Sequence, residues 1–524
     1  MKKSIFHSRI IFIIGALLIL IAGCYLLMHA MHWGPWAFSD SAAYVSAARN
    51  FSAGRGFVII NSNGSTTPVT EFPPFYAIFL SFFLGKSGDP NAIIPWVNVF
   101  LFTVFLLSVG LILFTAFKNN LLAFSGMLFC LFSPILLEIF SGVMSETLFF
   151  PLLYGIILLT ILVLRKRNEP LFVLLVVFSC LLPITRYAGA LFAGVITLMI
   201  LFFYPTPRKS KWMHAAIYAV TSLLPVAIWF LRLYTSTSKV GGKRFQLDWS
   251  IISNFWQSIR EEFKVLRTWL PYFSIYDNQT LDRAIVIGAL VLSIALLVYL
   301  AVALIRKKMK PSGETYKLVL LVIINLCAYL LFIALTHTIT IPQIDIINRM
   351  LAPILPMLFI LILAAVGLFV QHRRMLLVVF TAALLLVTLR FNFYQSSSFI
   401  AEMNENGHGY ANREYSQSGI IAQIQAIPDD QRMVSNAAAF VLYYTNRFPI
   451  QVDQFANRTF GKTNGYGEKW VREKGAALII LYPEFRNFYG KAAESLLETV
   501  TQGLDAAYQD ETGGIYYYPE SISD

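Results

Sequence analysis

Long blocks of apolar residues without charges recur along this chain of 524 residues, for example at 10–27 and 351–370. A helix of about 20 such residues spans the roughly 30 Å hydrocarbon layer of a bilayer. Only helices and closed β-barrels pair all of their backbone groups inside lipid, and these blocks lack the alternation of barrel strands. With 57% hydrophobic and only 13% charged residues, the chain is predicted to be an α-helical polytopic membrane protein.

The formal net charge of +12 invites a nucleic-acid function, but the placement of the charges argues against it. Each basic cluster stands at the end of an apolar block, which is typical of short cytoplasmic loops. We therefore interpret the charge as a topology signal with some attraction to anionic membrane lipids, and we expect no nucleic-acid partner. The clusters are Lys2, Lys3 and Arg9; Lys118; Arg165, Lys166 and Arg167; Arg208, Lys209 and Lys211; Arg306, Lys307, Lys308 and Lys310; and Arg373 and Arg374.

Pairing the apolar blocks with the basic clusters predicts about 11 transmembrane helices. The N-terminus is then cytoplasmic, the loops 32–91 and 232–282 lie outside, and the apolar stretch 72–84 is an interfacial or re-entrant helix because it is too short to span. The transmembrane domain is expected to cover residues 1–390. Its helices are expected at about 10–31, 92–116, 121–138, 146–164, 170–185, 187–204, 213–231, 283–305, 316–336, 351–370 and 375–390.

The tail, residues 391–524, is polar and has short alternating apolar runs. Such a pattern indicates a small soluble α/β domain, which the topology places on the extracytoplasmic side. The tail contains no cysteine, so no disulfide stabilises it. Strands are expected at 433–435, 476–481 and 515–518, and helices at 437–444 and 491–500.

Acidic and basic residues gather where the predicted helices meet the outer face. Ionisable groups at membrane depth are costly and are candidates for function. An arginine can hold a phosphate through two hydrogen bonds, and a carboxylate can take a proton from an attacking hydroxyl. The residues concerned are Asp40, Glu71, Glu146, Arg186, Asp345, Asn348 and Arg349.

Each of these residues also has a purely structural interpretation. Asp40 can cap a helix over 41–50, and Glu146 can sit in the first turn of a helix where the helix dipole favours it. Arg186 and Arg349 can anchor helix ends at the lipid interface. The remaining acidic residues, Glu71 and Asp345, can be ordinary loop residues.

A family resemblance rests on several short motifs in the order in which they occur. The segments DSAAY at 40–44, ARN at 48–50 and GRGF at 54–57 resemble the first outer loop of the GT-C glycosyltransferases, the superfamily of protein O-mannosyltransferases and bacterial aminoarabinose transferases. The other matching elements are EFPPFY at 71–76, SET at 145–147, TRYAG at 185–189 and DIINRMLAP at 345–353.

The resemblance implies specific roles for these residues. Asp40 would be the general base, Glu146 the second acidic position of the catalytic site, and Arg186 or Arg349 the ligand of the donor phosphate. Glu71 matches a position that in some members helps to bind a divalent metal ion. The other site candidates within the motifs are Tyr44, Arg55, Asp345 and Asn348.

Two departures from the family pattern leave the metal and the phosphate contact open. Many members carry a second acidic residue beside the first, where this chain has Ser39 and Ser41 flanking Asp40. Some members have a lysine before the proline, where this chain has Phe72. Apart from the divalent metal ion, no cofactor is expected.

The resulting hypothesis is a glycosyltransferase that moves a hexose or pentose from a polyprenyl-phosphate donor. The acceptor, a protein, lipid or polysaccharide, would lie at the outer face of a bacterial inner membrane, and a single base opposite the leaving group implies inversion. The alternatives are a lipid or sugar transporter or flippase, which calls for ionisable residues near the bilayer midplane and inverted repeats, and a non-catalytic envelope assembly factor.

Overall fold

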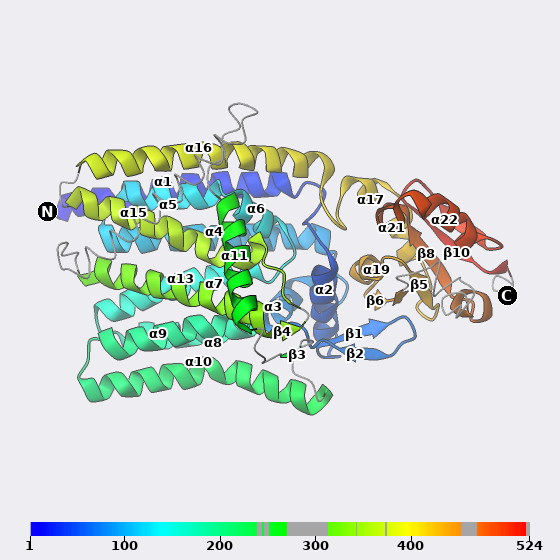
Figure 1. The fold of residues 1–524 in the computed structure, drawn as a ribbon, viewed down its shortest axis with the longest axis horizontal. Coiled ribbons are helices and arrows are strands. Elements are labelled where there is room, and N and C mark those ends of the chain that lie inside the picture. The colour runs from blue at the N-terminus through cyan, green and yellow to red at the C-terminus, as the bar shows by residue number, and fades with distance from the viewer. Residues whose placement is uncertain are drawn as a thin grey trace.

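The computed structural model describes residues 2–237, 244–245, 251–269, 313–341, 343–371, 375–451 and 469–519. Long helices lie side by side in one half of the molecule, and a mixed helix and strand region forms the other half (Figure 1). The N-terminus lies at the far end of the helical half, and the C-terminal region lies at the opposite end (Figure 1). The protein is therefore an α-helical polytopic membrane protein with a small C-terminal α/β region.

Seven helices among the described residues are long and apolar enough to cross a membrane. One of these spans consists of three consecutive segments, a short α14 (Asn348–Leu351), a 3₁₀ turn (Ala352–Ile354) and α15 (Leu355–Gln371). The predicted helix at 283–305 lies outside the described residues. The other spans are α1 (Lys2–Ala30), α4 (Pro90–Phe117), α7 (Glu146–Arg165), α10 (Arg208–Thr237), α13 (Gly313–Ile339) and α16 (Met375–Asn406).

The predicted helix 121–138 is not continuous. Its two parts, α5 (Asn120–Leu131) and α6 (Pro134–Ser141), meet at a bend of 61°. Pro134 has no N–H to continue the first helix, and the Ser133 hydroxyl accepts the N–H of Leu136 and thereby starts a second one. The two short apolar helices predicted next are present as α8 (Glu169–Thr185) and α9 (Gly189–Phe203).

The last span is longer than its apolar block. α16 continues to Asn406 instead of ending near residue 390. Its polar end stays helical because it packs along the end of α1, where the Asn404 amide donates to the His29 carbonyl at 2.9 Å and Trp33 Nε1 donates to the Asn404 carbonyl at 2.9 Å.

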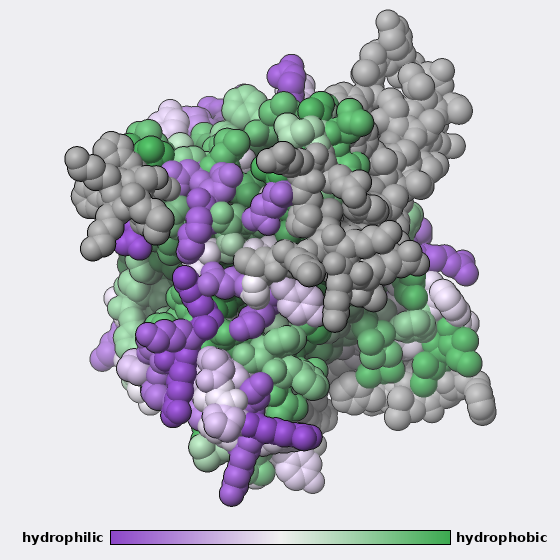
Figure 2. All heavy atoms as spheres, turned by 90° about the vertical axis from the view of Figure 1, so that its left-hand side faces the viewer, coloured by the Kyte–Doolittle hydropathy of each residue, from purple (hydrophilic) through white to green (hydrophobic). Residues whose placement is uncertain are grey.

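Basic residues gather at the end of the helical half that carries the N-terminus. Arg165 at the end of α7 pairs with Glu314 at the start of α13, 2.6 Å between Nε and Oε1. Lys317 Nζ donates to the Leu164 carbonyl at 2.5 Å. Hydrophilic side chains spread over this end face between apolar flanks (Figure 2). This arrangement agrees with the clusters that the positive-inside rule assigns to one side.

The outer loop 32–91 folds together with the tail. It contains α2 (Ser39–Ser52), the hairpin of β1 (Val58–Asn61) and β2 (Thr66–Pro68), and α3 (Phe75–Leu84). β1 also pairs in parallel with β6 (Arg447–Phe448) of the tail. The buried Arg49 joins the two regions, because its guanidinium donates to the carbonyls of Tyr443 and Gly88, each at 2.9 Å.

The tail forms a five-stranded sheet in the order β7-β5-β8-β10-β9. β5 pairs in parallel with β7 and β8, whereas β10 pairs antiparallel with β8 and β9. The strands and helices expected for the tail are confirmed within one to two residues at each end. They are β5 (Met433–Ser435), β8 (Ala477–Leu481), β10 (Gly513–Tyr517), α19 (Ala438–Thr445) and α22 (Ala493–Thr501). Elements that were not predicted are β7 (Ile450–Gln451), β9 (Asp505–Gln509), α17 (Arg413–Gln417), α18 (Ile420–Gln425) and α21 (Tyr482–Tyr489).

The segment 36–38 joins three parts of the chain just before α2. Trp36 bridges Gly142, and Ala37 bridges Gly409. Gly409 has a φ of +63°, and a Cβ built on it would lie 2.1 Å from the Ala37 carbonyl oxygen. Only glycine therefore permits this close approach of the tail to the segment that leads into α2.

Replacing Gly409 by alanine is predicted to destabilise the protein by about 1–3 kcal/mol, because the new methyl group meets backbone and the conformation is strained. Thermal unfolding of the purified protein in detergent measures the effect. The control is G155A, where a Cβ meets nothing within 4 Å and the change to alanine favours helix by up to about 1 kcal/mol. Equal melting temperatures for G409A and the unaltered protein would contradict the prediction.

Candidate active site

Glu146 is the first residue of α7, and its side chain is only 1% exposed. Its Oε1 forms ion pairs with the guanidinium groups of Arg186 and Arg349, the latter at 3.3 Å from Nε. The Ser145 hydroxyl donates to Oε2 at 3.3 Å. A carboxylate without water is stable only when cations and donors replace its hydration, and this one has two cations.

Arg186 is held at the break between α8 and α9. α8 ends at Thr185, and the Arg186 N–H still donates to the Leu182 carbonyl at 3.1 Å. A Cβ on Gly189 would lie 2.5 Å from the same carbonyl oxygen, so glycine allows the tight return into α9. The guanidinium also donates to the Ser145 hydroxyl at 3.3 Å and lies over the Phe149 ring at 6.0 Å.

Arg349 approaches from the short helix α14 and reaches α2. Its Nη2 lies 3.2 Å from Oδ2 of Asp40, which is the second residue of α2. The guanidinium also covers the Phe38 ring at 5.1 Å. Two tyrosine hydroxyls hold the turn that carries Arg349. Tyr329 donates to the Met350 carbonyl at 2.8 Å, and Tyr154 donates to the Pro353 carbonyl at 2.9 Å.

The four charged residues form one chain of ion pairs, Asp40–Arg349–Glu146–Arg186. Glu146 is the most buried of the four side chains at 1% exposed, followed by Arg186 at 17%, Arg349 at 23% and Asp40 at 28%. The carboxylate of Asp40 and the guanidinium of Arg349 are therefore the parts that a substrate can reach. Asp40 and Arg349 are thus accessible to water and ligands, whereas the Glu146 side chain is buried.

Tyr44 of α2 borders this chain of charges and is buried. Burial raises the pKa of its hydroxyl, and the carboxylates of Glu146 and Asp40 raise it further, against opposing effects of Ser145 and Arg186. The hydroxyl therefore remains a hydrogen-bond donor beside the acidic groups. Its ring packs against Phe72, 4.8 Å between ring centroids.

The structural alternative for Asp40 is wrong. Phe38, not Asp40, is the N-cap of α2, and its N–H donates to the Ser41 hydroxyl at 3.1 Å. Ser41 in turn donates to the Val143 carbonyl at 2.7 Å. The helix start is thus satisfied without Asp40, which is free to pair with Arg349.

Four other predicted residues do not join the chain of charges. Glu71 and Asp345 are exposed, and no ion pair links either to it within the described residues. Arg55 is exposed and donates instead to Asn50 Oδ1 at 3.1 Å. Asn348 is next to Arg349 in sequence, but its Oδ1 accepts the Trp269 Nε1–H at 2.9 Å.

This hydrogen bond to Asn348 holds the end of α11 (Ile251–Thr268) beside the site. α11 crosses the long helices at a steep angle in Figure 1 and packs on α13. The sequence analysis predicted a polar loop here and did not predict this helix. Its apolar residues recur with helical spacing, a pattern from which the helix could have been predicted.

One further acidic residue, Glu138 of α6, was also missed. Its carboxylate is partly buried and interacts with Arg349. Glu138 is the last residue of the apolar block 121–138, so a search for carboxylates at outer helix ends had the signal to find it.

The described residues hold no group of three or more His, Cys, Asp or Glu side chains close enough to share a metal ion. Glu71 is exposed and belongs to no such group. The divalent metal ion at Glu71 stays a prediction.

Comparison with solved structures finds the same fold in ArnT from Cupriavidus metallidurans. The crystal structure of ArnT bound to undecaprenyl phosphate superposes with a TM-score of 0.59 at 13% identity, over 97% of this chain and 99% of that one. The apo structure gives 0.55 at 11%, over 97% and 98%. No protein-family model and no curated protein matches. At this identity the likeness shows the fold alone, that of the ArnT structures.

Substitution of the buried and the exposed carboxylate should have unequal effects on stability. E146Q leaves Arg186 without its carboxylate partner and Arg349 with Asp40 alone, and losing one partner of a buried pair costs about 3–5 kcal/mol. D40N alters a pair that is a quarter exposed, where the expected cost is at most about 1 kcal/mol.

Thermal unfolding of both variants in the same detergent compares them. The double variant with E146Q and R186M should recover part of the loss, because it removes the guanidinium that E146Q leaves without a carboxylate. A D40N protein as unstable as E146Q would contradict the assignment of Glu146 as the buried centre.

Proposed function

We propose that this protein is a glycosyltransferase that moves a sugar from a polyprenyl phosphate to an acceptor hydroxyl at the outer face of a bacterial inner membrane. The observation that carries the proposal is the accessible pair of Asp40 and Arg349, set in the fold of ArnT, one structure of which holds undecaprenyl phosphate. The pair supplies a base and a cation at the helix ends that face the soluble domain.

The reaction needs few groups from the protein. The bond between the anomeric carbon and the phosphate oxygen breaks, and polyprenyl phosphate leaves without being protonated. The acceptor oxygen bonds to the same carbon, and its proton passes to a carboxylate. A guanidinium placed beside the phosphate stabilises the charge that develops on it.

The unequal burial of the carboxylates supports a division of roles. Glu146 is closed off between two guanidinium groups, so it positions them and does not receive a proton. Asp40 is the more exposed carboxylate and lies at the edge of the site. We assign Asp40 as the general base.

Arg349 is the better candidate for the donor phosphate. Arg186 is committed to Glu146, Ser145 and Met350, whereas Arg349 is more exposed and has Asp40 as its outer partner. When a donor phosphate takes the outer side of Arg349, the Asp40 carboxylate is released from that ion pair and can face the acceptor hydroxyl.

The stereochemistry and orientation belong to the same proposal. A single base opposite the leaving group favours direct displacement with inversion. We place the N-terminus in the cytoplasm and the tail on the extracytoplasmic side. The basic residues at the N-terminal end of the bundle support this orientation. Whether a hexose or a pentose is moved stays open.

The placement of the charges also bears on the alternatives. A transporter or flippase calls for ionisable groups near the middle of the spans, but Glu146 begins its span and Arg349 lies at the second residue of its own. A non-catalytic assembly factor would have no use for a base at the site, which makes Asp40 the residue that separates the two hypotheses.

Replacing Asp40 by asparagine is predicted to lower transfer by about 10²–10⁴-fold, because asparagine accepts no proton. Release of free polyprenyl phosphate from a labelled polyprenyl-phosphate sugar by the purified protein measures it. The matched control is D505N on the exposed strand β9. Near-normal release by folded D40N protein would refute the base assignment.

Replacing Arg349 by lysine keeps the charge but removes the two-pronged phosphate contact. The KM for the lipid-linked donor is therefore expected to rise about tenfold or more. The control is R486K, which alters an exposed pair with Glu494. An unchanged donor KM in R349K would move the phosphate contact to another cation.

A further inference from the structure

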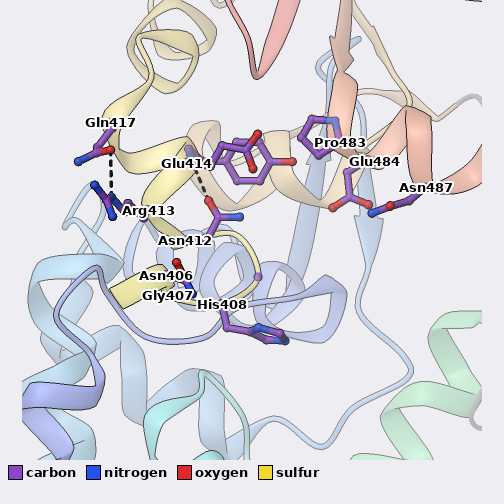
Figure 3. Close-up of a pocket in the computed structure, with 12 residues that line it drawn as sticks. Asn406, Gly407, His408, Asn412, Arg413, Glu414, Gln417, Pro483, Glu484 and Asn487 are labelled. Carbon is purple, nitrogen blue, oxygen red and sulfur yellow. Dashed lines mark hydrogen bonds between the residues drawn. The ribbon is translucent and has the colours of Figure 1, made fainter. Parts of the chain in front are cut away.

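A polar pocket of about 600 Å³ opens between the end of α16 and the tail domain. Asn406, His408 and Asn412 border it on one side, and Glu484 and Asn487 of α21 lie on the other (Figure 3). None of these residues has a role in the proposed reaction. The volume lies within the roughly 300–1,000 Å³ typical of small-molecule sites.

One buried hydroxyl in the pocket has no partner among the described residues. Tyr415 is 2% exposed and lines the pocket, and its phenolic oxygen makes no hydrogen bond there. Burial raises the pKa of this hydroxyl, and the carboxylates of Glu484 and Glu414 raise it further, so it stays protonated. A buried donor left unsatisfied is costly and calls for an acceptor.

The lining narrows the chemistry of a ligand. Side-chain amides donate and accept hydrogen bonds, and ionised carboxylates accept them, so both can bind hydroxyl groups. The Glu414 and Glu484 carboxylates disfavour a phosphate, and the nearby Arg413 is engaged with Gln417 at 3.3 Å and with the Trp33 ring at 5.8 Å. An apolar ligand would leave the polar lining residues without hydrogen-bond partners. A neutral polyhydroxyl compound fits best.

The pocket also connects to the active site. The bridge between Gly409 and Ala37 joins the pocket wall to the segment that leads into Asp40. Ring contacts run from His408 to Trp36 at 5.3 Å, from Trp36 to Phe38 at 5.4 Å, and from Phe38 to the Arg349 guanidinium at 5.1 Å. A series of packed rings therefore links the pocket lining at His408 to the guanidinium that pairs with Asp40.

We propose that this pocket binds a neutral sugar unit of the acceptor, so that the acceptor is a glycan or glycolipid. The proposal rests on the proposed glycosyl transfer, since it names the class of acceptor for that reaction. The Tyr415 hydroxyl donates to a sugar oxygen, and the side-chain oxygens of Glu484 and Asn487 accept hydrogen bonds from sugar hydroxyls. The bound sugar unit holds the rest of the acceptor next to Asp40.

Saturation-transfer NMR on the full-length protein in detergent tests binding directly, without any catalytic step. The probes are mannotriose, chitotriose, a glycerol-phosphate trimer and a short peptide containing serine and threonine. A trisaccharide is expected to receive saturation. Y415F and E484Q should each weaken its binding about three- to tenfold, the effect of losing one hydrogen bond.

Matched controls are Y394F and E498Q, which change exposed residues outside the pocket. Y415F should also melt at the same or a higher temperature than the unaltered protein, because no internal hydrogen bond of the described residues is lost. Weaker sugar binding without loss of stability is a result that a merely structural tyrosine cannot produce.

Three outcomes would overturn the proposal: no saturation of either trisaccharide, equal sugar binding in Y415F and E484Q, or saturation of the glycerol-phosphate trimer or the peptide alone. The proposed reaction is judged separately by polyprenyl phosphate release in the unaltered protein. Sugar binding without any donor turnover would refute the proposed transfer reaction but support the sugar site. Donor turnover without sugar binding would support the reaction and refute the sugar site.

Discussion

The buried ion pairs of Glu146 with Arg186 and Arg349 are the interaction on which the site depends. Glu146 begins α7, Arg186 lies between α8 and α9, and Arg349 lies in α14. A closed carboxylate needs both cations, so these three helix ends must meet whenever the protein is folded. Arg349 in turn reaches Asp40 at the start of α2.

The same dependence extends into the soluble region through segment 36–38. Trp36 bridges the α6–α7 turn, and Ala37 bridges Gly409 after α16. The tail is therefore not an appendage attached by a linker. Its glycine, its strand beside β1 and its contacts to Arg49 join it to the loop that carries Asp40.

How far the sequence predicts this site depends on the range of the interaction concerned. That Asp40, Glu146, Arg186 and Arg349 face one side follows from counting spans and basic clusters. That Arg349 joins Asp40 to Glu146, while Asp345 and Glu71 stay outside, depends on contacts between residues more than 100 positions apart. Periodicity and charge rules contain no information about such pairs.

The amino-acid sequence by itself determined that the chain carries membrane-spanning helices with basic residues at their ends, and that a small α/β region follows, because hydrophobic length and charge act locally. The tertiary structure decided the bend before α6 and the continuation of α16 to Asn406. It alone decided which carboxylate is buried and which is accessible, because burial is set by the elements that pack around a side chain. The difference between Glu146 and Asp40 is therefore a property of the fold.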